Sequence, residues 1–373
     1  MRRILISVAC AAVIGGALLA ASAQADFPYG SGPTFDPHDS STYHLQPGTA
    51  APNDLGGNDW KYAATPETGN TPVNNEPWEL NGVRGAHVAD SDGGVRTAWM
   101  ATTGRPDVTI AVLDSGIKWN DPGLVVDLRY KTKLNKGELP VPNHSGSTLV
   151  PTDPSITCAS YANAYDANGD GIFNLKDYAC DSRINLSDPR RAGPSGMFTP
   201  EDIVIAFSNG DDADGNGYKD DIAGWDFLDN DNNPFDDVQY GHGSGEARGG
   251  AGEVNNGGNS SPCPNCMITP FRVGDSFVAD ANRFAQAAVY AVDNDFQIIQ
   301  EALGTLNNTR LARQAVDYAY RHGVAVIASA ADEAAQHHNY VSALPNRLPS
   351  ATNESPTRSG TTMQLGQEPD WSP

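Results

Sequence analysis

The sequence has few basic residues for its length. Lys and Arg together make 24 of the 373 residues, against 46 Asp and Glu, and the formal net charge is -22. A surface of this charge repels the phosphate backbone of nucleic acids and the head groups of anionic membranes. We therefore expect no nucleic-acid partner, and cations are the more compatible ligands.

Long hydrophobic runs are also scarce. One run, residues 4–20, follows Arg2 and Arg3 and precedes small residues ending at Ala25. This order is typical of a signal peptide at residues 1–25, and a membrane anchor, the alternative, needs a longer span of ~20 residues. No later run is long and apolar enough to span a bilayer. We expect a secreted monomer without membrane contact once the signal is cleaved.

Cysteines are few, and four remain after the predicted cleavage. An even number in an oxidising compartment predicts disulfides, and local pairing favours Cys158 with Cys180 and Cys263 with Cys266. The two other connectivities stay open. The spacing of Cys263 and Cys266 also occurs in redox pairs, but those usually lie at the start of a helix after a strand, whereas a strand-like run follows here.

The apolar pattern divides the chain into an irregular first part and one domain. Residues 26–76 lack any apolar period and predict an extended or disordered segment, and residues 77–373 form the domain. Buried-strand patterns occur at residues 108–113, 267–273, 296–303 and 324–328, and helix-like patterns at residues 281–292 and 309–322. This alternation predicts an α/β fold, a parallel β-sheet with helices on both faces and a binding site at the carboxyl ends of the strands.

Residues 125–240 interrupt this pattern with Asp, Asn, Gly and Pro. Because they show little apolar periodicity, we expect a long loop insertion that needs something other than a hydrophobic core to order it.

Two stretches of the insertion have the spacing of calcium-binding loops. Oxygen-bearing side chains recur at alternate positions, a glycine follows at the sixth, and the seventh offers its backbone carbonyl. The first loop predicts as ligands Asp166, Asn168, Asp170, Ile172, Asn174 and Asp177, and the second predicts Asp212, Asp214, Asn216, Tyr218 and Asp220. The alternative is a pair of solvated acidic turns. Two such loops in one exported chain favour Ca²⁺ as the cofactor.

Two further residues are candidates for catalysis. Asp114 ends the first buried strand, where α/β sites are built, and His242 lies between two glycines just after the insertion. Each alone is an ordinary turn or surface residue. Together, with residues 94–99 before the strand, residues 209–227 in the insertion and residues 302–304 later, their order resembles the subtilisin-like serine proteases.

The resemblance covers about residues 78–344 and implies roles for particular residues. Asp114 would orient His242, and His242 would take a proton from a serine that attacks a peptide carbonyl. Ala302, Leu303 and Gly304 would bind the backbone of a protein or peptide substrate as an added strand.

The sequence departs from the family pattern at three places. Asp332 stands where the family has an Asn that donates a hydrogen bond to the oxyanion, and an ionised carboxylate there opposes the developing charge. Residues 244–246 read Ser-Gly-Glu where the family usually has Thr-His-Val. The family's Gly-Thr-Ser followed by an apolar helix is not found, because the similar stretch around Thr362 leads into a short, Pro-containing tail.

These features predict a secreted, calcium-dependent subtilisin-like serine endopeptidase whose serine segment is not in this chain. The alternative is a non-catalytic calcium-binding pseudoprotease that binds extended peptides. A third hypothesis, a calcium-binding surface protein without peptidase ancestry, requires the order of the motifs to be coincidental.

Overall fold

The computed structural model describes most of the chain beyond residue 101. Its described residues are 87–89, 95–97, 102–144, 146–151, 153, 156, 158, 164–237, 241–253, 256, 261–275, 278–329, 340–344 and 348–350. The helices in these ranges are all too short or too polar to cross a lipid bilayer. The predicted signal peptide and the segment 26–76 lie outside the described residues.

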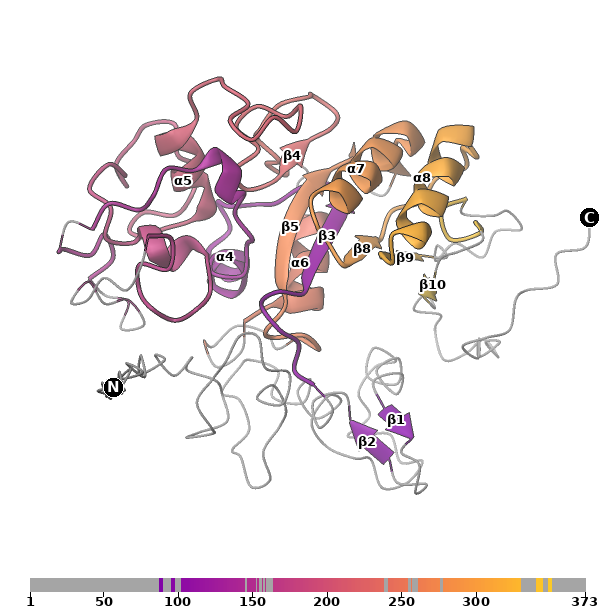
Figure 1. Cartoon of the computed structure of the whole chain (residues 1–373), viewed down its shortest axis with the longest axis horizontal. Coiled ribbons are helices and arrows are strands. Elements are labelled where there is room, and N and C mark those ends of the chain that lie inside the picture. The colour runs from indigo at the N-terminus through magenta and orange to yellow at the C-terminus, as the bar shows by residue number, and fades with distance from the viewer. Residues whose placement is uncertain are drawn as a thin grey trace, which may run out of the picture.

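A six-stranded parallel sheet forms the centre of the molecule (Figure 1), in the order β10-β9-β8-β3-β5-β4. Its strands are β3 (Thr109–Asp114), β4 (Trp225–Asp226), β5 (Met267–Arg272), β8 (Ile298–Glu301), β9 (Ala325–Ser329) and β10 (Leu348–Ser350). All residues of β3 and β5 are buried, as continuous β-branched and apolar runs predict for strands covered on both faces. The predicted parallel α/β sheet is confirmed.

Helices cover both faces of this sheet. On one face, Ile110 and Val112 of β3 pack with α4 (Pro122–Leu128) and α6 (His242–Ala251). On the other face, Ala111 and Leu113 pack with α7 (Ala281–Asp293) and α8 (Arg310–Arg321), which lie side by side (Figure 1). Alternate residues of one strand therefore serve two hydrophobic layers, as the two-residue period of a strand requires.

The ends of α7 and α8 have clear local causes. The side chain of Asp280 accepts hydrogen bonds from the backbone at the start of α7, and Thr309 does the same at the start of α8. Gly323, with a φ of 77°, follows α8 and allows the chain to turn into β9. Both helices agree with the predicted ranges to within one or two residues.

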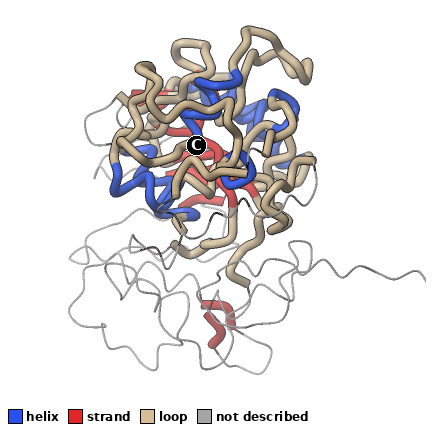
Figure 2. Tube along the Cα trace, turned by 90° about the vertical axis from the view of Figure 1, so that its left-hand side faces the viewer, coloured by secondary structure: helices blue, strands red, loops and turns tan. Residues whose placement is uncertain are grey.

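The insertion has a hydrophobic core of its own, so the expectation that it lacks one is wrong. Leu175, Tyr178, Phe198 and Ile203 are fully buried in it, in and around the short helices η5 (Leu175–Tyr178) and α5 (Pro200–Phe207). Sequence periodicity misses this core because its apolar residues come from loops rather than from long elements. Figure 2 shows how much of the described chain consists of loops, drawn in tan.

Buried charge and a disulfide add to the order of the insertion. Arg191 pairs with Asp202, and both side chains are almost fully buried. Cys158 is bonded to Cys180, as preferred from the sequence, and Cys263 is bonded to Cys266. The second pair stands directly before β5, where no helix begins, and this position favours a structural bridge over a redox role.

Several small elements were not predicted. Besides α4, α5, η5, β4 and β10, they include the strand pairs β1 (His87–Ala89) with β2 (Val95–Thr97) and β6 (Gly274–Asp275) with β7 (Val278–Ala279), and the 3-10 helix η4 (Lys136–Glu138). Two- and three-residue strands are shorter than any periodic pattern can reveal.

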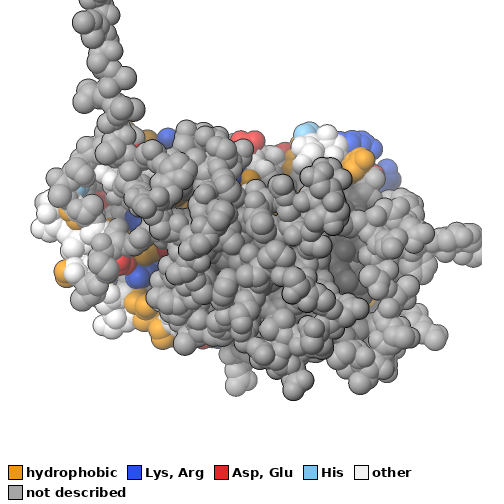
Figure 3. All heavy atoms as spheres, turned by 90° about the horizontal axis from the view of Figure 1, so that it is seen from below, with side chains coloured by type: hydrophobic (Ala, Val, Ile, Leu, Met, Phe, Trp, Pro, Cys, Tyr) orange, Lys and Arg blue, Asp and Glu red, His pale blue; other side chains and the backbone are white. Residues whose placement is uncertain are grey.

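In Figure 3 the visible side chains of the described residues are of mixed chemical type.

Candidate active site

The fold brings Asp114 and His242 together at the carboxyl end of the sheet, although 128 residues separate them. Asp114 is the last residue of β3, and His242 is the first residue of α6. Nδ1 of His242 lies 2.7 Å from Oδ1 of Asp114. The Asp114 side chain is 1% exposed and that of His242 is 17% exposed, so the histidine is the member that other molecules can reach.

Ser115 ties the end of β3 to the start of α6. Its backbone N–H donates to Oδ1 of Asp114 at 2.7 Å. Its hydroxyl donates to Asp236 at 2.8 Å and accepts from the backbone N–H of Gly243 at 2.9 Å. These contacts hold the carboxylate and the helix that carries the imidazole in one fixed relation.

The start of α6 approaches the end of β3 and the turn after it so closely that position 243 must be glycine. A Cβ on residue 243 would clash with the backbone of Gly116 and lie 3.1 Å from Cβ of Asp114. A Cβ on Gly245, in the same helix, would meet nothing within 4 Å.

We expect Gly243→Ala to lower the free energy of unfolding by about 1 to 3 kcal/mol, because the clash is with backbone atoms that cannot rotate away. Gly245→Ala, the matched control, should raise it by about 0.5 to 1 kcal/mol through its higher helix propensity. Urea unfolding of both variants measures the difference. Equal stabilities for the two variants would contradict the close approach of α6 to β3.

The contact between Asp114 and Nδ1 of His242 affects both the pKa and the tautomer of the imidazole. The hydrogen bond to Asp114 raises the pKa of His242, and the nearby carboxylates of Glu246 and Asp236 raise it further, while partial burial opposes them. Because an ionised carboxylate only accepts hydrogen bonds, Nδ1 of His242 must donate. Nε2 of the neutral ring then carries the basic lone pair, which is the requirement for a general base.

Two acidic residues near this pair were not predicted as site residues. Glu246 lies one helical turn after His242, and Glu301 is the last residue of β8, opposite Leu113 of β3. Burial and the charge of Asp114 raise the pKa of Glu246 and raise that of Glu301 well above its ordinary value. The sequence feature that could have indicated Glu246 and Glu301 is an acidic residue within a segment that is otherwise buried.

Glu301 is 1% exposed, and neither carboxyl oxygen has a partner at hydrogen-bond geometry among the described residues. The backbone N–H of Leu303 lies near enough to offset part of the rise in its pKa. A buried carboxyl in these surroundings is stable only in its neutral form.

We expect Glu301→Gln to be more stable than the original chain at high pH and similar to it at low pH. The pKa of Glu301 is higher in the folded than in the unfolded chain. The protonated Glu301 therefore contributes its full share to the free energy of unfolding below pH ~4.3, and this contribution is lost as the pH rises toward the folded-state pKa. The difference in free energy of unfolding should grow by up to about 1.4 kcal/mol per pH unit over that range. Urea unfolding from pH 4 to 8 tests this.

Asp211→Asn is the control for Glu301→Gln, because it removes one carboxylate from an exposed loop position. If the effect of Glu301→Gln on the free energy of unfolding varies with pH no more than that of Asp211→Asn, the carboxyl of Glu301 is not held in a charge-excluding environment.

The predicted substrate strand directly follows β8. Ala302 and Gly304 are partly exposed, and Leu303 is buried. Val278 of β7 pairs with Gly304, and the backbone N–H of Ala279 donates to the Gly304 carbonyl at 3.0 Å. These residues therefore lie at the same carboxyl edge of the sheet as Asp114, which stays compatible with their predicted role.

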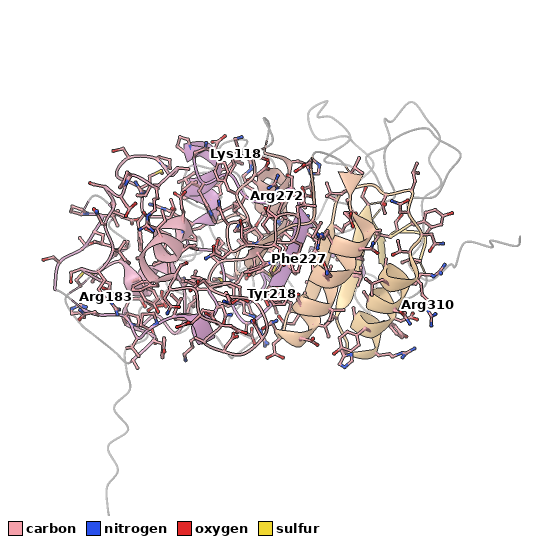
Figure 4. All side chains as sticks on the ribbon, turned by 90° about the horizontal axis from the view of Figure 1, so that it is seen from above. Lys118, Arg183, Tyr218, Phe227, Arg272 and Arg310 are labelled. Atoms are coloured by element: carbon pink, nitrogen blue, oxygen red, sulfur yellow. A yellow bond between two sulfur atoms is a disulfide. The ribbon has the colours of Figure 1, made fainter. Side chains whose placement is uncertain are left out.

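Arg272, the last residue of β5, organises acidic loops beside this edge. It pairs in register with Asp114, and its guanidinium contacts the carboxylates of Asp226, Asp229, Asp237 and Asp275. Figure 4 shows Arg272 in the central part of the molecule, with Arg183 and Arg310 toward opposite ends. One cation among four carboxylates leaves this region of the surface negatively charged.

The second acidic loop contributes to a compact carboxylate cluster. Ligand atoms of Glu138, Asp214 and Asp221 lie within 4.8 Å of one another. Asn135 and Asn216 bridge the carboxylates of Asp214 and Asp221. Burial raises the pKa of Glu138 and of Asp221.

This oxygen-rich donor set fits Ca²⁺, which binds carboxylate and carbonyl oxygens. The cluster differs in part from the predicted ligands. The predicted ligand Asp214 belongs to the cluster. The predicted ligand Asp220 does not, because it accepts hydrogen bonds from the backbone of Asn209 and Gly210, and Asp221 belongs to the cluster instead. Asp212 accepts from the backbone of residues 215–217. Glu138 was missed because it lies 74 residues before the loop.

The first acidic loop is closed by its own side chains. Asp177 accepts hydrogen bonds from the backbone of Ala167 and Asn174, and burial raises its pKa to about 8. Asp170 accepts from the backbone of Ile172 and from the side chain of Asn168. The metal role predicted for Asp166, Asn168, Asp170, Ile172, Asn174 and Asp177 stays a prediction.

Asp332 and Thr362 lie outside the described residues, so their predicted positions stay untested.

The fold and this site define an α/β protein with an acid–histidine pair at the carboxyl edge of a parallel sheet. Residues 105–367 match the model of Peptidase S8, the subtilase family. The chain belongs to the subtilase family, and the resemblance inferred from its motifs is confirmed.

Named relatives agree with this assignment. The chain is 35% identical over 114 residues to the thermophilic serine proteinase of Bacillus sp. (strain AK1), covering 29% of this chain and 27% of that protein. It is 32% identical over 136 residues to thermitase of Thermoactinomyces vulgaris, covering 36% of this chain and 48% of thermitase. The matches thus span about a quarter and about a half of the relatives' lengths.

Solved structures similar to this chain include sphericase and the S41 psychrophilic protease. Sphericase is 25% identical with a TM-score of 0.28, and the S41 protease is 28% identical with a TM-score of 0.30. Each match covers 33% of this chain and 44% of the other.

Proposed function

We propose that the protein is a secreted, calcium-stabilised serine endopeptidase in which Asp114 orients His242 and His242 is the general base. The observation that carries this proposal is the 2.7 Å contact between Nδ1 of His242 and Asp114, in a family named for subtilisin-like proteases. The relatives named above are a serine proteinase and thermitase, which supports the same reaction class.

The chemistry follows from the two ring nitrogens of His242. Nδ1 donates to the buried carboxylate of Asp114, which fixes the orientation of the ring and stabilises the imidazolium. Nε2 removes the proton from the serine hydroxyl as the hydroxyl oxygen attacks the peptide carbonyl, and later returns this proton to the leaving amine. The substrate backbone would pair with residues 302–304.

Two participants are proposed from the family pattern alone. Asp332 would occupy the position of the oxyanion donor, which requires its protonated form. The nucleophilic serine would belong to a family segment with the sequence Gly-Thr-Ser, which this chain does not contain. The similar stretch at Thr362 is not followed by a long apolar run in the sequence.

Calcium would bind Glu138, Asp214 and Asp221, with further oxygens from the second loop. A bound Ca²⁺ would neutralise carboxylates that otherwise repel one another, and thereby stabilise the insertion that packs beside the sheet.

The test compares two forms of the secreted protein in the presence of Ca²⁺. The 373-residue chain should not hydrolyse denatured casein above a no-enzyme control, whereas a chain completed with the family's serine segment should, and a serine-directed phosphonate should abolish that activity. If the completed chain is inactive yet both forms bind extended peptides in a fluorescence titration, the non-catalytic peptide-binding alternative replaces the peptidase.

A further inference from the structure

Glu246 lies close to the catalytic pair without a role in the mechanism above. It is four residues after His242 in α6. Residues four apart in a helix lie on the same face, with their Cβ atoms ~5 to 6 Å apart. The carboxyl of Glu246 and the imidazole of His242 therefore belong to one face of one helix, turned toward the sheet.

The sheet holds the Glu246 carboxyl in place. Nε2 of Gln300 donates to Oε2 of Glu246 at 3.2 Å and approaches its backbone carbonyl at 3.4 Å. Gln300 belongs to β8 and pairs in register with Val112 of β3, two residues before Asp114. Glu246 is thus fixed over the strands that end at the active site, and its carboxylate does not point freely into solvent.

The electrostatic relation between Glu246 and His242 is reciprocal. The charge of Glu246 raises the pKa of His242, and the charge of His242 lowers the pKa of Glu246, which burial and Asp114 otherwise raise. Two oppositely charged groups that interact in this way lose their protons in coupled steps.

Other charged groups border this region on every element packed against α6. The carboxylates are Asp114 on β3, Asp127 on α4, Asp236 in the loop before α6 and Glu301 on β8, and the cations are Lys118 after β3 and Arg272 on β5. Among the carboxylates, Asp114, Glu246 and Asp236 act on the His242 imidazole. Glu246 is the one among these three that shares the helix of the imidazole.

We propose that Glu246 is a second acidic positioning residue for His242, a carboxyl one helical turn away that favours the protonated imidazole and titrates together with it. The proposal deepens the proposed function, since it concerns the base of that reaction. In its ionised form Glu246 opposes removal of the proton from Nε2. It therefore places the onset of the neutral, catalytically competent imidazole at a higher pH than Asp114 alone would.

The test is an NMR titration of the 373-residue chain labelled with ¹³Cε1-histidine. The protein has 8 histidines, and the His242 signal is assigned by its loss in His242→Ala. In the original chain the signal should titrate in two steps, a main step for the ring and a smaller one at lower pH for Glu246. In Glu246→Gln the smaller step should disappear and the main midpoint should fall by ~0.5 to 1 pH unit.

Three variants separate this effect from a structural one. Glu246→Asp keeps the charge and should retain the two steps, and Asp211→Asn, remote in the second acidic loop, should change nothing. Gln300→Met keeps the carboxylate but removes its anchor, so the midpoint should move less than in Glu246→Gln. Circular dichroism verifies that each variant is folded, and Gln300→Met serves as the test variant if Glu246→Gln does not fold, since it too should move the His242 midpoint.

The proposal is overturned if Glu246→Gln leaves the His242 midpoint unchanged while Asp114→Asn lowers it, or if the single-step curve is already present in the original chain. This outcome is independent of peptidase activity, because the titration measures proton affinity in a chain that needs no nucleophile. Conversely, an inactive completed chain would refute the proposed function and leave the titration result intact.

Discussion

Replacement of His242 by alanine is expected to abolish peptide hydrolysis in a chain completed with the family's serine segment. In the proposed mechanism the imidazole takes the serine proton, so kcat should fall by ~10⁴ to 10⁶. Asp114→Asn should lower kcat by ~10⁴, because the amide NH2 can donate to Nδ1 and thereby favours the tautomer that carries its proton on Nε2. Initial rates with a chromogenic peptide, measured against the pH, give both numbers.

The matched control is His322→Ala. His322 lies just after the end of α8 and bonds the carbonyl of Tyr318, away from the carboxyl edge of the sheet. Its replacement should leave kcat within about twofold of the original. A His242→Ala variant that keeps comparable activity would show that the 2.7 Å pair with Asp114 is structural.

Removal of calcium is expected to lower the melting temperature of the 373-residue chain by roughly 5 to 10 °C. A ligand that binds only the folded chain at a hundredfold excess over Kd stabilises it by ~2.7 kcal/mol, and for a domain of this size each kcal/mol corresponds to ~2 to 4 °C. Ligand atoms of Glu138, Asp214 and Asp221 lie within 4.8 Å of one another, so the proposed ion would offset the repulsion between their ionised forms. Thermal melts with added Ca²⁺ and with EGTA measure the shift.

Asp214→Asn should reduce that response, because it removes a carboxylate from the cluster while preserving its shape. Asp211→Asn, three residues earlier and exposed, should keep the full response to EGTA. A melting curve that EGTA does not move in the original chain would identify the acidic loops as solvated turns.

The sequence by itself determined the class of fold, because the strands of a parallel sheet are buried on both faces and leave continuous apolar runs. Thr109–Asp114 and Met267–Arg272 are such runs, and the capped helices α7 and α8, which connect β5, β8 and β9, specify the parallel topology. The pair Asp114 and His242 was also predictable, but through the order of motifs in the family rather than through any local signal.

The tertiary structure alone decided which charged groups share an environment. The sequence places Glu301 in a buried segment, but only the pairing of β8 with β3 and β9 shows that its carboxyl oxygens have no partner at hydrogen-bond geometry among the described residues. Glu138 joins Asp214 and Asp221 across more than 70 residues, which loop spacing cannot show. Burial and Coulomb interactions depend on distance in space, whereas sequence patterns record only neighbours along the chain. For the same reason the core of the insertion, assembled from loop residues such as Phe198 and Ile222, became visible only in the folded chain.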